Sequence, residues 1–189
     1  RLTYHYIDAK APQNEVIPQG VRYAYEKPVF KTGSKSGIWD IGWQISDQWK
    51  WENQLIYSKY TNDRRSLPVN LRGNPAALDG KEIQWEPKIS FKSADQKTGA
   101  LLGLYYFRSK QHEWVDMNAR LGGRNRFNDK TETKALFGEI RVTPLENMEV
   151  TFAARYEQER HQRHGGSSVL RIQRDKTDRV LLPKLDIAF

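Results

Sequence analysis

The sequence predicts an all-β protein, and specifically an antiparallel β-barrel that spans a membrane. Segments with alternating apolar and polar residues recur along the chain, and the connections between them alternate between long and short. Within a segment, the charged residues fall opposite the aromatic ones. Side chains of a strand point in turn to its two faces, so each segment has one apolar and one charged face. That pattern is typical of a strand between lipid and a watery lumen.

Residues 82–92 are the most regular segment. The odd positions carry Ile, Trp, Pro, Ile and Phe, and the even positions carry Glu, Gln, Glu, Lys, Ser and Lys. We expect the odd residues to face lipid and the even residues to face the lumen. Pro87 lacks a backbone donor, so we also expect a neighbouring bulge to absorb the lost hydrogen bond.

Seven further segments show a β-like pattern, which gives eight expected strands. They cover residues 2–7, 36–46, 49–60, 81–92, 98–116, 131–143, 149–160 and 178–189. The four expected long connections are 8–35, 61–80, 117–130 and 161–177, and short turns separate the other strands. Outer-membrane barrels have this rhythm of short periplasmic turns and long extracellular loops. A soluble all-β domain remains the alternative, because a sandwich core would also bury one face of each strand.

Composition excludes a helical membrane protein. The longest apolar run, residues 99–107, covers nine residues, whereas a spanning helix needs about 20. A mean hydropathy of -0.81 and a content of 29% charged residues are typical of a soluble protein. Alternating strands of about 9–11 residues are nevertheless long enough to cross a membrane. The chain contains no cysteine, so it has neither disulfides nor a thiolate metal site.

The net charge of +8 is concentrated in the four long connections, while the strands and short turns together are close to neutral. A basic vestibule would attract anions toward the lumen. Arginine forks suit carboxylate and phosphate oxygens. The alternatives are contact with lipopolysaccharide phosphates or simple solvation of loop charge. By loop position and charge, the predicted ligand-binding residues are Arg64, Arg65, Trp114, Arg124, Arg126, His161 and Arg163.

Other functional classes find little support in the sequence. Inward-facing glutamates alternate with lysine and arginine, which favours ion pairs in the lumen wall over acid catalysis. His161 and His164 are too few for a metal site without a placed carboxylate. Acidic and basic residues are interleaved along the strands, which argues against nucleic acid as a partner. We therefore expect no catalytic residues, no metal and no cofactor.

Several strands resemble a known family. Residues 135–144 and 148–157 form a hairpin similar to one that recurs in the barrels of TonB-dependent outer-membrane receptors. Residues 181–185, and 86–91 with 99–107, also fit that family's strands. Residues 4–8, which lead to Ile17 and Pro18, are similar to the siderophore-receptor type. The resemblance covers most of residues 36–189.

The resemblance implies a plugged barrel of about 22 strands in the outer membrane of a Gram-negative bacterium. It further implies import of a ferric siderophore or a similar anionic iron chelate. Energy would come from the TonB complex through an N-terminal plug, and outer-membrane lipid and lipopolysaccharide would surround the barrel.

Neither a plug nor an energy-coupling box is recognisable in these 189 residues, and eight strands are about a third of such a barrel. One interpretation is therefore a single-domain segment of a larger barrel. The other is a complete eight-stranded barrel that acts as an adhesin, a lipopolysaccharide-binding protein or an enzyme. Pairing between residues 2–7 and 180–189 distinguishes the two, because only the small closed barrel requires it.

Overall fold

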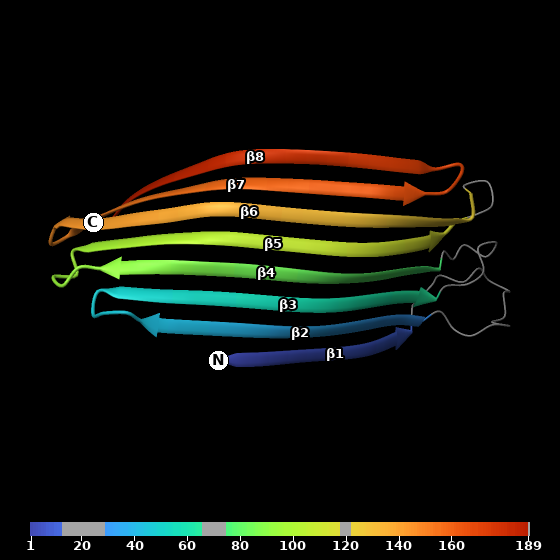
Figure 1. Ribbon diagram of the computed structural model, residues 1–189, viewed down its shortest axis with the longest axis horizontal. Coiled ribbons are helices and arrows are strands. Elements are labelled where there is room, and N and C mark those ends of the chain that lie inside the picture. Colours follow the sequence, from blue (N-terminus) through green and yellow to red (C-terminus); the bar gives the residue numbers. More distant parts are fainter. Residues whose placement is uncertain (13–28, 66–74, 118–121, 189) are drawn as a thin grey trace, which may run out of the picture.

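A computed structural model describes residues 1–12, 29–65, 75–117 and 122–188, and it shows one sheet of eight antiparallel strands in sequence order (Figure 1). The strands are β1 (Leu2–Pro12), β2 (Val29–Gln44), β3 (Trp49–Arg65), β4 (Ala76–Lys92), β5 (Thr98–Asp116), β6 (Arg124–Leu145), β7 (Met148–Gly166) and β8 (Arg171–Ala188). The predicted all-β antiparallel fold is confirmed. In the part of the chain that the structure describes, no helix is long and apolar enough to cross a membrane.

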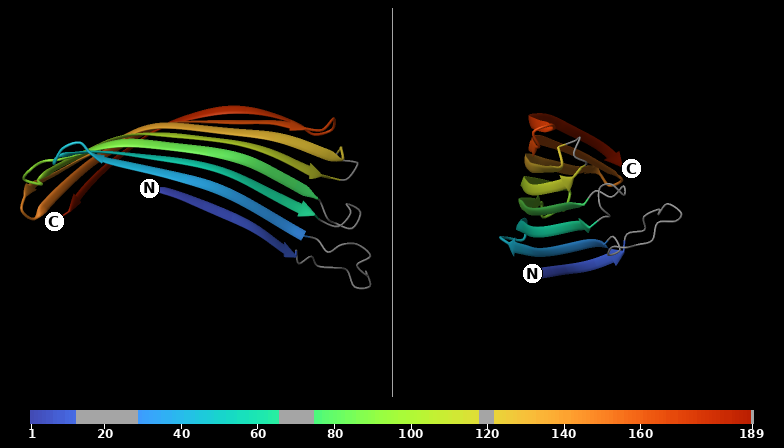
Figure 2. Two further views of the ribbon diagram at one scale, coloured as in Figure 1. Left: turned by 60° about the horizontal axis from the view of Figure 1, so that its bottom comes forward. Right: turned by 90° about the vertical axis from the view of Figure 1, so that its right-hand side faces the viewer.

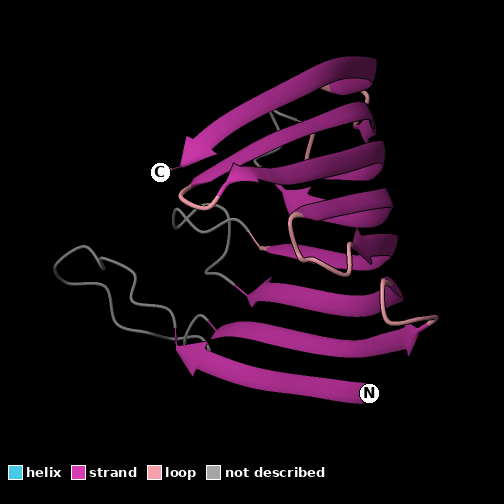
Figure 3. Ribbon diagram, turned by 90° about the vertical axis from the view of Figure 1, so that its left-hand side faces the viewer, coloured by secondary structure: helices cyan, strands magenta, loops and turns pink. Residues whose placement is uncertain are grey.

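The sheet is open. Strands β1 and β8 form its two edges, and among the described residues each has only one neighbouring strand (Figure 3). The sheet is also arched and twisted (Figure 2). Almost every described residue of β8 is exposed, because no other strand in the described part of the chain pairs with its outer edge. The expectation of a small barrel closed between residues 2–7 and 180–189 is therefore wrong for these strands.

The strands are longer than the sequence pattern indicates. Residues 45–48, 93–97 and 146–147 connect strands at one end, called the turn end here. At the opposite loop end, β7 and β8 are joined by residues 167–170, whereas 161–177 was the expected loop. The difference has a physical cause. Toward the loop end both faces of the strands are polar, so the alternation disappears while the backbone ladder continues.

Each face of the sheet has a distinct character. The face that carries Glu82 and Glu86, called the polar face, also carries the buried side chains Asn125, Phe127 and Thr133. The face that carries Trp85, called the apolar face, presents large exposed apolar side chains toward the turn end. These include Trp39, Trp43, Leu102, Leu136, Phe152 and Leu185. The predicted alternation in residues 82–92 is confirmed.

Pro87 interrupts the ladder without a bulge. Trp85 is opposite Tyr106, pairing is lost for two residues, and it resumes with Lys88 opposite Gly103 in the same register. The pairing with β3 is continuous, with Asn53 opposite Pro87. Pairing of β4 at Pro87 is therefore lost only with β5. The expected bulge beside Pro87 is wrong, since the strands absorb the proline by leaving that short gap.

The border between apolar and charged residues runs obliquely across the apolar face. Lys35 of β2 and Lys130 of β6 belong to one ladder row. Going from the turn end toward the loop end, the first charged residue of the apolar face is Lys35 on β2 and Lys134 on β6. Lys134 is four residues nearer the turn end than Lys130, which lies in the row of Lys35. That is a shift of about 13 Å across four strand spacings of about 4.8 Å, or roughly 35°. Strands of closed barrels tilt by a similar angle.

Gly103 tests the crowding of the polar face. A Cβ there would collide with the Phe137 ring, whereas a Cβ at Gly42, on the same face, would meet nothing within 4 Å. We expect Gly103→Ala to lower the free energy of unfolding by about 1–3 kcal/mol through overpacking. Gly42→Ala is the control and should not destabilise the protein. Urea unfolding of the full-length protein in detergent, followed by tryptophan fluorescence, measures both, and equal effects would contradict this packing.

Candidate functional site

The structure distributes the predicted ligand residues over both faces of the sheet. Trp114, Arg124 and Arg126 lie on the apolar face, near the loop end. His161 and Arg163 lie on the polar face of β7, and Arg64 lies on the polar face of β3. The side chain of Arg65, the last residue of β3, lies outside the described residues. The predicted set therefore does not form one site. Residues expected in loops are in strands, where neighbours alternate between faces.

Arg124 already has an anionic partner. Its Nε donates to Asp116 Oδ1 at 3.2 Å, and its Nη2 donates to Oδ2 at 2.9 Å. The guanidinium Cζ also lies 4.3 Å from the centroid of the Trp114 ring. This fork-to-fork arrangement joins the ends of β5 and β6. Arg124 thus has a structural role in the sheet. Arg126 lies opposite Trp114 in the ladder and is exposed.

Arg163 connects three strands on the polar face. Its Nη2 lies 2.8 Å from Glu113 Oε2 on β5, and its Nη1 lies 3.1 Å from Asp129 Oδ2 on β6. The guanidinium Cζ stands 4.7 Å from the centroid of Phe127, which is only 5% exposed. The charge of Arg163 is therefore balanced within the wall, which leaves a structural role for this side chain.

His161 belongs to the same paired network. Its Nδ1 is 3.1 Å from Thr131 Oγ1, and its Nε2 pairs with the Glu159 carboxylate, which accepts a further bond from Thr133. Other pairs on the polar face join Lys88 to Glu86, Arg155 to Glu157, and Arg141 to both Glu139 and Glu149. We expected ion pairs between strands on this face. Arg141 with Glu149 is such a pair, whereas the pairs of Lys88 and Arg155 and the contact of Arg141 with Glu139 join residues two apart on one strand.

Arg174 is a polar-face cation that the sequence did not single out. It lies opposite Arg163 in the β7–β8 ladder and is exposed. Among the described residues, no carboxylate lies within ion-pair distance of Arg174, whereas neighbouring Lys176 pairs with Asp178 at 2.8 Å. In the sequence, Arg174 was only one of the basic residues in the expected loop 161–177. Only the register of β7 and β8 could show which face it occupies.

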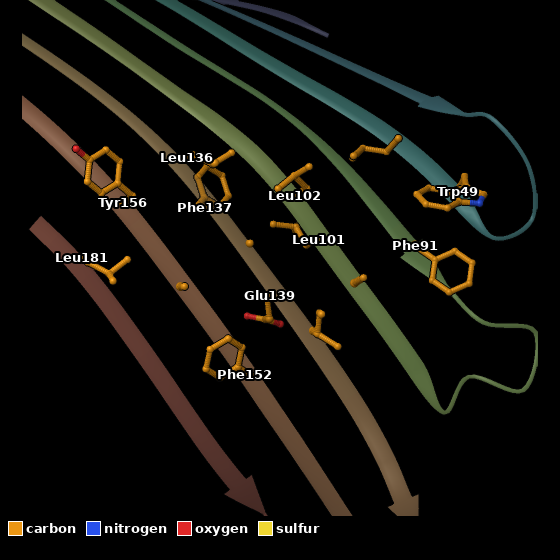
Figure 4. Close-up of a pocket in the computed structure, with 15 residues that line it drawn as sticks. Trp49, Phe91, Leu101, Leu102, Leu136, Phe137, Glu139, Phe152, Tyr156 and Leu181 are labelled. Carbon is orange, nitrogen blue, oxygen red and sulfur yellow. The ribbon is translucent and has the colours of Figure 1, made fainter.

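A hollow on the apolar face offers little to a polar ligand. It has a volume of about 740 Å³ and lies between β3 and β8, beside Leu102, Leu136 and Phe152 (Figure 4). Glu139 is its one charged lining residue, but the carboxylate of Glu139 lies on the polar face, where it pairs with Arg141 at 3.5 Å. Among the described residues, no group of three His, Cys, Asp or Glu side chains could hold a metal ion.

Comparison with known proteins supports the fold. No protein family model matches the sequence. The chain is similar in structure to the ferric yersiniabactin uptake receptor FyuA from Yersinia pestis, with a TM-score of 0.71 and 13% sequence identity. The match covers 89% of this chain and 27% of FyuA, so the chain spans about a quarter of the receptor's length. At this identity the likeness shows the fold alone, which is that of a β-barrel wall.

The Arg124–Asp116 pair predicts an acid-resistant contact at the loop end. The Arg124 guanidinium lowers the pKa of the Asp116 carboxyl below its ordinary value. Because the folded pKa is depressed, the contribution of the pair is present above the unfolded pKa and is lost as pH falls through the folded one. We expect Arg124→Met to raise the titration midpoint of Asp116 in carboxyl-carbon NMR. Arg126→Met is the control and should leave that midpoint in place; an unshifted midpoint in Arg124→Met would contradict the assignment.

Proposed function

We propose that this chain forms part of the wall of an outer-membrane receptor barrel that takes up a ferric siderophore or a similar anionic iron chelate. The observation that supports this proposal is the different character of the two faces of the sheet. One face is polar with paired charges, the opposite face has an apolar band, and the fold is like that of a barrel wall. Lipid outside and water inside account for both faces.

The height of the apolar band supports the membrane assignment. On β4 it runs from Ile83 to Phe91, which is about 27 Å along the strand and about 22 Å along the membrane normal at a tilt of 35°. Barrels of the outer membrane carry an apolar band about 25 Å tall between aromatic girdles. Trp49 and Phe91, whose ring centroids are 4.9 Å apart, suit the girdle at the turn end.

The polar face near the loop end supports an anionic ligand. Arg174 supplies positive charge that no described carboxylate balances, and a basic lumen mouth raises the local concentration of anions. We retain Arg64 as a proposed ligand-side residue because it shares this face. His161 and Arg163 also lie on this face, but their side chains are already paired within the wall, so we no longer propose them as ligand contacts. Trp114, Arg124 and Arg126 are on the opposite face, so we no longer propose them as ligand contacts. The proposed role is energised transport through the TonB complex, without covalent chemistry.

Uptake of radioactive iron tests the proposal. A bacterium that carries the full-length gene and its deletion strain are offered ferric yersiniabactin, a ferric hydroxamate and a ferric catecholate. We expect the gene to restore uptake of at least one chelate. A protonophore should abolish that uptake and leave surface binding intact, because import needs energy from the inner membrane. If none of the three chelates is bound or imported in a gene-dependent way, the siderophore proposal fails.

Two arginines on opposite faces test which face meets the ligand. Arg174→Glu reverses a charge on the polar face, and Arg126→Glu reverses one on the apolar face. For the chelate that is imported, we expect Arg174→Glu to weaken binding to whole cells about tenfold, which corresponds to about 1.4 kcal/mol. Arg126→Glu should leave binding unchanged. A loss confined to Arg126→Glu would place the ligand on the wrong face for this account.

A further inference from the structure

A line of cations borders the apolar band on its loop-end side. On five neighbouring strands, β2 to β6, the first charged residue of the apolar face is basic. We call these residues the basic rim: Lys35, Lys59, Lys81, Arg108 and Lys134. Lys35, Lys59 and Lys81 share one ladder row, and Arg108 and Lys134 are displaced from that row by two and four residues toward the turn end.

A second tier of lysines adds to the rim. Lys110 lies opposite both Lys81 and Lys130, and Lys81 in turn lies opposite Lys59. Like charges directly opposite each other in a sheet are destabilising, so this row carries a cost that an external anion would relieve. Glu132 moderates the repulsion at the β6 end of the rim. It contacts Lys134 at 2.9 Å and Lys130 at 3.7 Å, and it lies opposite Arg108 in the ladder.

The centre of the rim is not neutralised. Within residues 1–12, 29–65, 75–117 and 122–188, no carboxylate lies within ion-pair distance of Lys59, Lys81 or Lys110. The Nε of Arg108 is buried and has no hydrogen-bond partner among those same residues. A single lysine can extend its ammonium group into water without any basic residues beside it. Here the unbalanced charge is continuous across adjacent strands.

A shallow hollow of about 240 Å³ lies at this centre. Lys81, Arg108 and Lys110 line it together with Tyr57 and Ile83, which top the apolar stretches of β3 and β4. Glu82, the remaining lining residue, belongs to the polar face, where it accepts a bond from Ser109. The hollow therefore presents three cations directly above apolar side chains, an arrangement that fits a molecule with an anionic head and apolar tails.

We propose that the basic rim binds the phosphate groups of lipopolysaccharide, with its acyl chains against the apolar band below. This inference rests on the outer-membrane location in the proposed function and assigns it a lipid partner. The rim lies where the head groups of the outer leaflet meet the barrel, and lipopolysaccharide combines several phosphates with a broad set of acyl chains. A row about 19 Å wide, at about 4.8 Å per strand, can engage more than one phosphate.

Native mass spectrometry of the full-length protein in detergent tests the proposal. The rim variant carries Lys59→Gln, Lys81→Gln and Arg108→Gln. The control carries Lys50→Gln, Lys88→Gln and Lys184→Gln, which removes equal charge from the polar face. Each protein is titrated with lipopolysaccharide, with enzymatically dephosphorylated lipopolysaccharide and with phosphatidylglycerol. Heat-modifiable migration on gels confirms that both variants are folded.

We expect the rim variant to bind lipopolysaccharide at least tenfold more weakly than the wild type, and the control to bind normally. The wild type should bind the dephosphorylated form and phosphatidylglycerol at least tenfold more weakly than lipopolysaccharide. Unchanged binding by the rim variant, or equal binding of the dephosphorylated form by the wild type, would overturn the proposal. The latter comparison needs no variant, so it stands even if the substitutions prevent folding. Equal binding of phosphatidylglycerol would replace lipopolysaccharide by a general anionic lipid.

Failure of this proposal is separable from failure of the proposed function. The rim is on the apolar face, so the rim variant should import the ferric chelate as the wild type does. Loss of lipopolysaccharide binding with intact uptake supports both proposals. Selective lipopolysaccharide binding by a protein that imports no chelate would retain the rim and remove the transport role.

Discussion

The backbone ladder is the constraint on which the rest of this structure depends. Seven antiparallel pairings run through eight strands, and the register is continuous in them except for a shift between Val142 and Leu145 beside the β6–β7 turn. Each side chain outside that turn is therefore assigned to a face by its position. A shift by one residue would exchange the two faces of a strand. Lipid offers no partner for a backbone amide, so a membrane-spanning sheet has to satisfy its hydrogen bonds between strands. Pro87 shows how tightly this holds: pairing lapses for two residues and resumes in the same register.

Face assignment decides what each cation can do. Arg163 and Arg174 are opposite each other on the polar face, yet their situations differ, because Glu113 and Asp129 balance only the first. Arg124 has a comparable carboxylate partner but projects to the apolar face. Positive charge near the loop end is therefore divided between the polar face and the apolar face, which in the proposed function meet the lumen and lipid, respectively. The polar face suits a soluble anion, while the basic rim suits the head group of a lipid.

Much of the fold follows from the sequence, because a strand with one apolar face requires apolar and polar residues to alternate. The eight strands and the faces of residues 82–92 were predictable on that basis. The strand ends were not, since Arg163 and Arg174 lie in ladder positions whose flanking residues are polar on both faces. Hydrophobic pattern carries no signal there. The candidate site could not be composed from the sequence for the same reason. Loop position does not show which face a residue occupies, and Arg124 and Arg163, from two expected loops, lie on opposite faces of the sheet.

The central claim is that the apolar face meets lipid and the polar face meets water. These 189 residues contain no cysteine, so a single cysteine can be placed at each position from 82 to 91. The full-length protein is used, with any cysteine outside this segment replaced by serine. Spin labels at these sites, in reconstituted bilayers, report collisions with oxygen in lipid and with a nickel chelate in water. The account predicts strict alternation, with oxygen favoured at Ile83, Trp85, Ile89 and Phe91 and nickel favoured at Glu82, Gln84, Glu86 and Lys88. Uniform accessibility to the nickel chelate on both faces would contradict it.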